Sequence, residues 1–339
     1  MMAAPLKVAT VGAGFFAAFH HDAWARHPDV EFVAIIDENL ASAQAAATKY
    51  GCQASDDLEG LLLSQEIDLL DIATPPDSHL ALVNVAARHG LSMICQKPLA
   101  DNLAGARAVV AAATGQLLVV HENFRFQPWY REIKRLLDRG QFGRLHNIAF
   151  RLRPGDGQGP DAYLSRQPYF QKMNRFLIHE TAIHFIDTFR FLLGEIETVY
   201  ADLKQVNPAI AGEDAGYVIF GFAGGAGGIF DGNRLNDHSA DNPRLTMGEM
   251  WLEGSTGVMR LDGDGRLFWK AHGGAETEHV YVWENVGFGG DCVYQLQDHV
   301  IRHLRDASPI ENSGANYLRN LEIEEAIYRS ADENRQIRL

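Results

Sequence analysis

The sequence has few cysteines, no long hydrophobic run and no basic cluster. Its 339 residues include only Cys52, Cys95 and Cys292, which are too few and too scattered for a disulfide framework or a zinc knuckle. They are expected to be reduced thiols, which suits the cytoplasm. The first strand-like run follows MMAAPLK too soon for a signal peptide, and no apolar stretch approaches the ~20 residues of a membrane span. We therefore expect a cytoplasmic protein that makes no membrane contact.

Positive charge is also scarce. The formal net charge is −14 at pH 7, and no run of lysine and arginine offers a surface for nucleic acid. A solvated acidic exterior accounts for this charge. Apolar residues make up 46% of the chain and charged residues 22%, which is the balance of a globular protein able to bury real cores. The length predicts two domains of ordinary size.

Short apolar runs alternate with helix-like segments over residues 1–122. The runs are LKVATVGA, VEFVAIID, IDLLDIATP, LSMICQKP and QLLVVHENF. Continuous apolar strands of this kind are buried on both faces of a sheet. The intervening segments begin with polar capping residues and stop at glycines such as Gly51 and Gly90, as helices do. This part of the chain predicts a parallel sheet wound with helices.

Residues 123–339 have longer alternating runs separated by glycine, aspartate and asparagine turns. The alternation predicts an antiparallel sheet with one apolar face. The glycine-rich stretch GFAGGAGGIF lies inside a strand pattern, so we expect a bent or bulged strand there rather than a phosphate loop. Two helical segments, around 292–306 and 317–334, close the chain.

A glycine-rich turn follows the first predicted strand. Gly12, Gly14 and Ala17 have the spacing GxGxxA, and Phe15 and Phe16 complete the turn. The first glycine permits the turn, the second lets a pyrophosphate approach the backbone, and the small third residue packs on the helix. The N-terminus of that helix offers free N–H groups to phosphate. These five residues are the first candidates for binding a dinucleotide cofactor.

An acidic residue ends the second predicted strand. Asp37 lies about 20 residues beyond the turn, where a carboxylate accepts hydrogen bonds from the ribose hydroxyls of the cofactor. Glu38 and Asn39 follow it without a nearby arginine, and a carboxylate repels a 2′-phosphate. NAD is therefore favoured over NADP.

Five motifs occur along the chain in a familiar order. They are His20 three residues beyond Ala17, TPPDSH at 74–79, QKP at 96–98, NFRFQP at 123–128 and ETAIHFIDTFRFLLG at 180–194. With them the chain resembles the Gfo/Idh/MocA oxidoreductases, the relatives of glucose-fructose oxidoreductase and inositol dehydrogenase, over essentially its whole length. The resemblance implies an N-terminal Rossmann domain, here residues 1–122. It also implies a C-terminal α+β domain, residues 123–339, with a large, mostly antiparallel open sheet.

The same resemblance implies an activity. Members exchange hydride between a nicotinamide cofactor and a sugar, sugar acid, cyclitol or related polyol. The open sheet often forms the oligomer interface, so a homodimer or homotetramer through residues of roughly 200 to 285 is expected.

The QKP motif places a lysine at the carboxyl edge of the parallel sheet, where ligands bind in this architecture. By the resemblance, Lys97 matches the catalytic lysine of an EKP motif and also contacts cofactor and substrate. Its ammonium can donate a hydrogen bond to the reacting oxygen. Gln96 stands where a glutamate is usual. Its amide can hold cofactor or lysine by hydrogen bonds, but it brings no negative charge. A plain surface lysine is the alternative.

The segment FLIHETAIHFIDTFRFLLG suggests a zinc motif at first. His179 and His184 are five residues apart, not four, so a metal site is disfavoured and none is predicted. Glu180 and His184 have the four-residue spacing that places a carboxylate beside an imidazole, leaving the other ring nitrogen as a base. The resemblance puts His184 on the catalytic histidine and Glu180 where an aspartate is usual. Asp187 is expected to anchor the helix, and an ordinary surface pair is the alternative.

Weaker candidates surround these motifs. Thr74, Pro75 and His79 follow the third strand on the expected path of the cofactor. His20 is interpreted as a packing or supporting group near the cofactor turn, and His21 as a solvent-facing residue. Neither is expected to be the general base.

Further candidates lie at and beyond the domain boundary. Glu122 and Asn123 close the fifth strand and are placed to meet the nicotinamide amide or ribose. Arg125 either contacts substrate or forms a buried ion pair, and the sequence leaves both open. Arg153, in a turn-rich loop over 151–170, is able to pair with the carboxylate of a sugar acid, although a plain surface loop is equally possible.

The sequence thus predicts an NAD-dependent dehydrogenase of a sugar-like substrate. The predicted substrate-binding residues are Lys97, Arg125, Arg153, Glu180 and His184. A non-catalytic dinucleotide-binding sensor on the same fold is one alternative, kept open by the changes at 96 and 180. A metal-dependent hydrolase or lyase is another, and the histidine spacing disfavours it.

Overall fold

The computed structural model describes residues 4–339, and the chain divides into two compact units. The first unit contains the chain up to residue 123 together with 291–319, and the second contains 124–290 and 320–339. The first division lies one residue from the boundary expected between residues 122 and 123. The segment 291–319 differs from the expectation, because it returns to the first unit.

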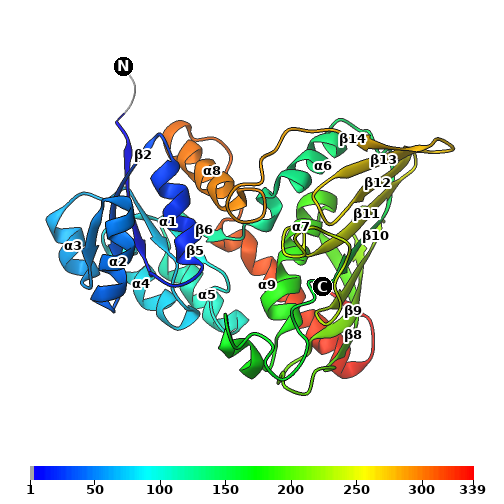
Figure 1. Cartoon of the computed structure of the whole chain (residues 1–339), viewed down its shortest axis with the longest axis horizontal. Helices are drawn as coiled ribbons and strands as arrows, with labels where there is room; N and C mark the ends of the chain where they lie inside the picture. Colours follow the sequence, from blue (N-terminus) through cyan, green and yellow to red (C-terminus); the bar gives the residue numbers. More distant parts are fainter. Residues whose placement is uncertain (1–3) are drawn as a thin grey trace. The chain divides into compact units, whose positions relative to one another are not determined.

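The first unit is built on a parallel sheet (Figure 1, blue to cyan). Its six strands have the order β3-β2-β1-β4-β5-β6, the order of a dinucleotide-binding Rossmann domain. The strands are β1 (Leu6–Val11), β2 (Val30–Ile36), β3 (Gln53–Ser55), β4 (Leu69–Ile72), β5 (Ser92–Gln96) and β6 (Leu118–His121). The sequence pattern missed β3, because three residues are too few to show a strand period.

Helices connect these parallel strands. They are α1 (Ala17–Arg26), α2 (Leu40–Tyr50), α3 (Leu58–Ser64), the 3₁₀ turn η1 (Pro76–Ser78), α4 (His79–Arg88) and α5 (Leu103–Ala112). Asn39 begins α2 by accepting hydrogen bonds from the backbone N–H groups of Ala41 and Ser42, and Gly51 ends it with φ +70°. The carboxyl ends of the strands therefore meet at one edge, where the site is built.

The returning segment contains α8 (Cys292–Asp306) and the beginning of α9 (Gly314–Glu333). Helix α8 packs against α1. The guanidinium of Arg26 forms a bidentate ion pair with the carboxylate of Asp291, with N–O distances of 2.9 and 2.6 Å. Residues far apart in the sequence thus complete one unit, which explains why local patterns assigned this segment to the other one.

The second unit contains a nine-stranded sheet of order β14-β13-β12-β11-β7-β10-β9-β8-β15. The strands are β7 (Leu145–Leu152), β8 (Ile196–Lys204), β9 (Ala215–Phe222), β10 (Gly227–Asn233), β11 (Gly248–Gly254), β12 (Gly257–Leu261), β13 (Leu267–Ala271), β14 (Glu276–His279) and β15 (Ile337–Arg338). Only β7 and β10 pair in parallel, and every other neighbouring pair is antiparallel. The predicted fold class, a Rossmann domain plus a mostly antiparallel open sheet, is confirmed.

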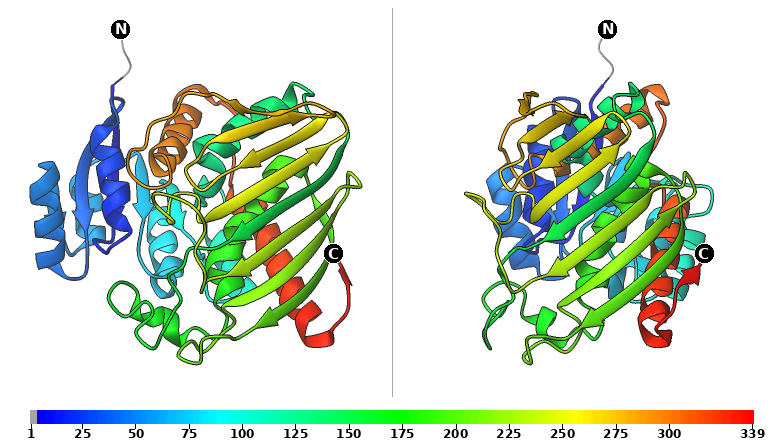
Figure 2. Two further views of the ribbon diagram at one scale, coloured as in Figure 1. Left: turned by 45° about the vertical axis from the view of Figure 1, so that its right-hand side comes forward. Right: turned by 90° about the vertical axis from the view of Figure 1, so that its right-hand side faces the viewer.

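The two faces of this sheet differ. The inward face buries large side chains such as Phe150, Phe220 and Phe230 against helices. On the outward face Ile219 and Ile229 are direct cross-strand neighbours, and they are 49% and 39% exposed. In the right-hand view of Figure 2 the strands lie in front and no helix covers this outward face.

The helical layer of this unit includes the elements that carry the candidate site. They are the 3₁₀ turn η2 (Phe124–Phe126), α6 (Pro128–Asp138), the 3₁₀ turn η3 (Pro168–Lys172), the π-helical turn η4 (Leu177–Ala182) and α7 (Ile183–Leu193). Among residues 4–339 there is no helix with the length and apolar character needed to cross a membrane.

Two local expectations are corrected. The stretch GFAGGAGGIF is a hairpin: β9 ends at Phe222, β10 begins at Gly227, and Gly225 adopts φ +81° in the turn. The glycines predict a bent strand, but the freedom of Gly225 to take positive φ reverses the chain here instead. The run HVYVWENV is a strand only to His279, after which residues 280–290 form no strand.

Candidate functional site

The glycine turn has the shape that a dinucleotide phosphate requires. Gly12 adopts φ +111°, and a Cβ there would lie 2.6 Å from the carbonyl oxygen of Ala73, so only glycine fits. At Gly14, by contrast, a Cβ would meet no heavy atom of the described residues within 4 Å. The first glycine therefore forms the turn, and the second leaves open space beside the backbone in which a pyrophosphate fits.

The carboxylate of Asp37 is held beside this turn. One oxygen accepts the backbone N–H of Ala13 at 2.7 Å, and the other accepts that of Asn39 at 2.9 Å. Each oxygen retains further acceptor capacity. Asp37 thus fixes the glycine turn and presents a negative charge at the end of β2, as a ribose-binding carboxylate does.

Hydrogen bonds of its own side chains stabilise the loop after β4. The hydroxyls of Thr74 and Ser78 are 2.6 Å apart. His79 is fully buried, with its ring nitrogens 2.9 Å from the carbonyl oxygen of Thr74 and 3.1 Å from that of Leu99. Burial lowers the pKa of His79. The ring joins the loops after β4 and β5, so we assign His79 a supporting role and keep Thr74 and Pro75 as candidates for cofactor contact.

The two phenylalanines of the turn have different environments. Phe15 is 60% exposed, whereas the ring of Phe16 packs against Phe19, His20 and His121. Phe15 is therefore the one whose ring is available to a ligand.

Gln96 and Lys97 lie at the end of β5 and are half-buried. The side-chain oxygen of Gln96 accepts the backbone N–H of Lys97 at 2.7 Å. Glu122 and Asn123, which follow β6, are buried. Lys97 is thus half-exposed at the strand edge where the glycine turn also lies, while Glu122 and Asn123 are shielded within the unit.

His21 was expected to face solvent, and this is wrong. Its side chain is buried, and Nε2 donates to the carbonyl oxygen of Gly12 at 3.1 Å. Burial lowers the pKa of His21 to about 4. The sequence shows only that 20 and 21 are adjacent on a helix. Packing against distant segments decides that both are covered, since His20 lies beside Asp71 and His121 and His21 lies beside Phe32 and Tyr50.

This burial makes the stability of the protein depend on pH. The unfolded chain takes up a proton at His21 near its ordinary pKa of 6.5, but the folded chain does so only near about 4. The stabilisation is therefore complete above pH 6.5 and is lost as the pH falls towards 4. We expect the titration of His21 to lower the free energy of unfolding by about 2 kcal/mol when the pH falls from 7.5 to 5.

Urea denaturation at pH 7.5 and pH 5 measures this loss. The variant His21→Gln keeps a side-chain N–H donor but has no titratable ring, so its free energy of unfolding should fall by less over the same interval. Equal losses for the variant and the parent protein would contradict the assignment.

In the second unit, His184 stands at the beginning of α7 and is buried. Its ring stacks face to face on Phe124, with centroids 3.9 Å apart and an angle of 6° between the planes. The hydroxyl of Thr188 donates to the backbone carbonyl of His184 at 2.8 Å. Stacking and helix together fix the plane of the imidazole, as a positioned acid–base group requires.

The residues before His184 form the π-helical turn η4 rather than a regular α-helix. Such turns are frequent at functional sites. Nδ1 of His179 lies 2.6 Å from Oε1 of Glu324, so this histidine belongs to a buried hydrogen-bonded pair of the second unit. Glu180 is half-buried. The α-helical four-residue spacing argument does not apply across a π turn, and the pairing of Glu180 with His184 stays a prediction.

Arg125 forms the buried ion pair that the sequence left open. Its Nε and Nη2 each donate at 2.7 Å to the carboxylate of Asp187, which is buried in α7. Asn320 also donates to Asp187 at 2.7 Å. Asp187 therefore anchors the helix that carries His184, as expected, and Arg125 belongs to the same support.

Arg153 is also engaged within the protein. Its Nη2 donates to both carboxylate oxygens of Asp231, at 2.8 and 2.7 Å, and its Nη1 donates to the carbonyl oxygens of Leu152 and Asp231. The side chain is buried. Both terminal nitrogens are engaged within the protein, and binding of a substrate carboxylate by Arg153 stays a prediction.

No sequence motif singles out Arg234, which organises the loop over 154–176. It is buried, forms ion-pair hydrogen bonds to Asp156, and donates to Thr181 in η4. Its guanidinium also lies over the rings of Tyr163 and Phe176. Although burial opposes ionisation, Arg234 keeps the pKa of Asp156 below its ordinary value. This network ties the loop to the turn that precedes His184.

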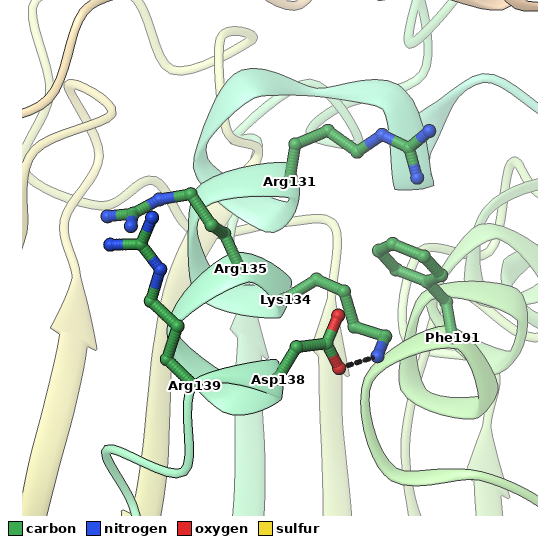
Figure 3. Close-up of a pocket in the computed structure, with 6 residues that line it drawn as sticks. All are labelled: Arg131, Lys134, Arg135, Asp138, Arg139 and Phe191. Carbon is green, nitrogen blue, oxygen red and sulfur yellow. Dashed lines mark hydrogen bonds and ion pairs between the residues drawn. The ribbon is translucent and has the colours of Figure 1, made fainter.

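A hollow beside α6 collects four cationic side chains, and two of them form ion pairs with carboxylates of the same helix. Figure 3 shows Arg131, Lys134, Arg135 and Arg139 on the helix, with Phe191 on one side. Lys134 pairs with Asp138, and Arg135 pairs with Glu132.

Comparisons with known proteins agree with this geometry. Residues 6–124 match the family described as "Oxidoreductase family, NAD-binding Rossmann fold", and residues 130–260 match the "GFO/IDH/MocA C-terminal domain". The chain is 34% identical to a D-apiose dehydrogenase of Paraburkholderia graminis, over 98% of this chain and 89% of that protein. It is 25% identical to an inositol 2-dehydrogenase of Rhizobium meliloti, over 98% of both.

A solved structure is also similar. It is an oxidoreductase from Agrobacterium radiobacter in complex with NAD+, L-tartaric acid and magnesium. The TM-score is 0.87 at 31% identity, and the match covers 98% of each chain.

Proposed function

Because the chain belongs to the Gfo/Idh/MocA oxidoreductase family and is an NAD-binding dehydrogenase acting on a CH–OH group, we propose that its substrate is a sugar of the D-apiose type. The observation that carries this choice is the 34% identity to a D-apiose dehydrogenase over 98% of the chain. Sugar acids and cyclitols are the other members of the predicted substrate class.

NAD, when bound, accepts the hydride of the carbinol carbon. The residues that would hold it are the glycine turn around Gly12 and Gly14, Asp37, and the loop of Thr74 and Pro75. We propose that His184 acts as general base and takes the proton of the substrate hydroxyl. Lys97 donates a hydrogen bond to the same oxygen, and Glu180 orients the imidazole.

A substrate panel tests the proposal. D-apiose, other aldoses, sugar acids and cyclitols are each incubated with NAD, and the absorbance of the reduced nicotinamide is followed. We expect the highest kcat/KM with D-apiose or a related sugar. A preference for a cyclitol would show that the substrate is a cyclitol and not a sugar of the D-apiose type. The absence of turnover with every compound of the panel would favour the non-catalytic sensor.

The preference for NAD over NADP follows from Asp37. A 2′-phosphate would approach a carboxylate that is already held in place by the glycine turn. We expect NAD to bind more tightly than NADP, and Asp37→Ser to narrow the ratio of the two dissociation constants by about tenfold, or about 1.4 kcal/mol. Isothermal titration calorimetry with both cofactors measures this ratio.

Two further variants separate charge from geometry. Asp37→Asn keeps a side-chain acceptor but removes the charge, so it should also narrow the ratio. Asp56→Ser removes an exposed carboxylate of the same unit and should leave the ratio unchanged. Equal affinities for NAD and NADP in the parent protein would overturn the assignment.

We also propose that the outward face of the nine-stranded sheet is the oligomer interface of a homodimer or homotetramer. Ile219 and Ile229 are exposed cross-strand neighbours, and Ala149 and Trp251 continue the row on β7 and β11. An apolar row on an otherwise uncovered face is suited to a second copy of the same chain.

Light scattering at micromolar concentration tests this assembly. Ile219→Arg together with Ile229→Arg is expected to convert the oligomer to a monomer, because it places charge in the apolar row. Leu63→Arg, at an 81% exposed leucine on α3, is the control and should not change the mass. A monomeric parent protein would refute the proposal. The cytoplasmic location stays a prediction from the scattered thiols.

A further inference from the structure

A hydrogen-bonded chain leads from the interior of the first unit to Lys97. Asp71, in β4, and His20, in α1, are both fully buried. Oδ2 of Asp71 lies 2.8 Å from Nδ1 of His20 and also accepts Nε1–H of Trp24 at 2.7 Å. Nε2 of His20 lies 3.3 Å from the side-chain nitrogen of Gln96. The other end of that amide meets the backbone of Lys97.

The donor and acceptor of each of these hydrogen bonds can be assigned by starting from Lys97. The backbone N–H of Lys97 is a donor, so the Gln96 atom that faces it, at 2.7 Å, is the amide oxygen. The Gln96 group that faces His20 is therefore the NH₂ group, which can only donate. Nε2 of His20 must then accept, which requires a neutral ring with its proton on Nδ1, and that proton points at Asp71.

We propose that Asp71 and His20 are positioning residues for Lys97, which act through the Gln96 amide. Asp71 selects the Nδ1–H tautomer of His20, His20 fixes which way the amide points, and the amide oxygen holds the main chain of Lys97. This inference rests on the proposed catalytic role of Lys97. It adds the residues that hold the lysine in place.

This series of hydrogen bonds also explains why glutamine suits position 96 in this protein. A carboxylate at 96 would have no N–H to offer the lone pair of His20. It would be accommodated only if His20 carried protons on both ring nitrogens, between two carboxylates. The ring is held between His121, at a centroid distance of 3.9 Å, and Phe16, so it has little room to turn away.

The tautomer is tested without any turnover. Nitrogen-15 NMR of the histidine-labelled protein distinguishes protonated from unprotonated ring nitrogens, and His20→Phe assigns the signals. We expect Nδ1 of His20 to be protonated and Nε2 unprotonated in the parent protein, and both to be protonated in Gln96→Glu. A protonated Nε2 in the parent protein would overturn the proposal.

The coupling is tested by a double-mutant cycle. His20→Phe fills the space of the ring but removes the acceptor, and Gln96→Leu removes the amide. Each is expected to lower kcat by about 10²-fold through misplacement of Lys97, with the KM for the sugar and the Kd for NAD little changed. Because the residues act in series, the double variant should lose no more than either single variant.

A second buried histidine provides the control. His27, at the C-terminal end of α1, is buried beside Asp298 and Tyr294, away from Gln96. His27→Phe should leave kcat unchanged. An unchanged kcat in His20→Phe, or losses that multiply in the double variant, would refute the positioning role. If Lys97→Met retains turnover, the catalytic role proposed for Lys97 fails instead, and the NMR result still decides the tautomer.

Discussion

Replacing His184 with alanine is expected to lower kcat by about 10²–10⁴-fold, the usual contribution of a general base. The ring is buried and stacked flat on Phe124, so its plane is fixed before substrate arrives. Without it, no positioned group on α7 takes the hydroxyl proton. NAD binding, measured by calorimetry, should stay close to that of the parent protein, because the cofactor residues belong to the first unit.

His179 provides a matched control within the same stretch of chain. It is also a buried histidine, but its partner is Glu324, at 2.6 Å. His179→Ala leaves the buried carboxylate of Glu324 without this hydrogen-bond partner and should lower the free energy of unfolding by roughly 1–3 kcal/mol. The two variants therefore separate a catalytic from a structural histidine. Unchanged turnover in His184→Ala would move the proton transfer to Lys97 and leave α7 with a structural role.

Lys97→Met is expected to lower kcat by a comparable factor, about 10²–10⁴-fold, because methionine keeps the length of the side chain and removes the ammonium. The lost hydrogen bond is made to an oxygen whose charge changes during the reaction, so it matters mostly in the transition state. The Kd for NAD and the folding midpoint should change little.

Lys49→Met removes an exposed ammonium from α2 of the same unit and is the control for net charge. It should retain full activity. If Lys97→Met also retained activity on the best sugar of the panel, the lysine would have no part in the chemistry. If the parent protein itself turned over no substrate while binding NAD, the non-catalytic alternative would replace the dehydrogenase.

Local sequence patterns determined much of the first unit. Continuous apolar runs identified five of its six strands, since burial on both faces leaves no polar alternation. The spacing GxGxxA identified the cofactor turn for a steric reason, because a Cβ at Gly12 would collide with the carbonyl of Ala73. The order of five motifs identified the family. Each of these properties depends on residues close together in the chain.

The sequence also determined the type of the second sheet, but not its details. Alternating residues on β7, β9 and β10 predicted one buried and one outward face. The turn at Gly225 and the end of β14 at His279 were missed. An extended run is a strand only when a neighbour supplies hydrogen bonds, and the pattern of one segment does not show whether that neighbour exists.

The tertiary structure alone decided which polar side chains meet. His20 and Asp71 are 51 residues apart, and Arg153 and Asp231 are 78 apart, so neither pair leaves a local pattern. The order of strands places Asp71 beneath α1, and the parallel pairing of β7 with β10 brings Asp231 to Arg153. A single sequence shows which side chains can donate or accept. Which of them are buried together depends on how distant segments pack, because the cost of leaving a polar group unpaired arises only when the fold removes it from water.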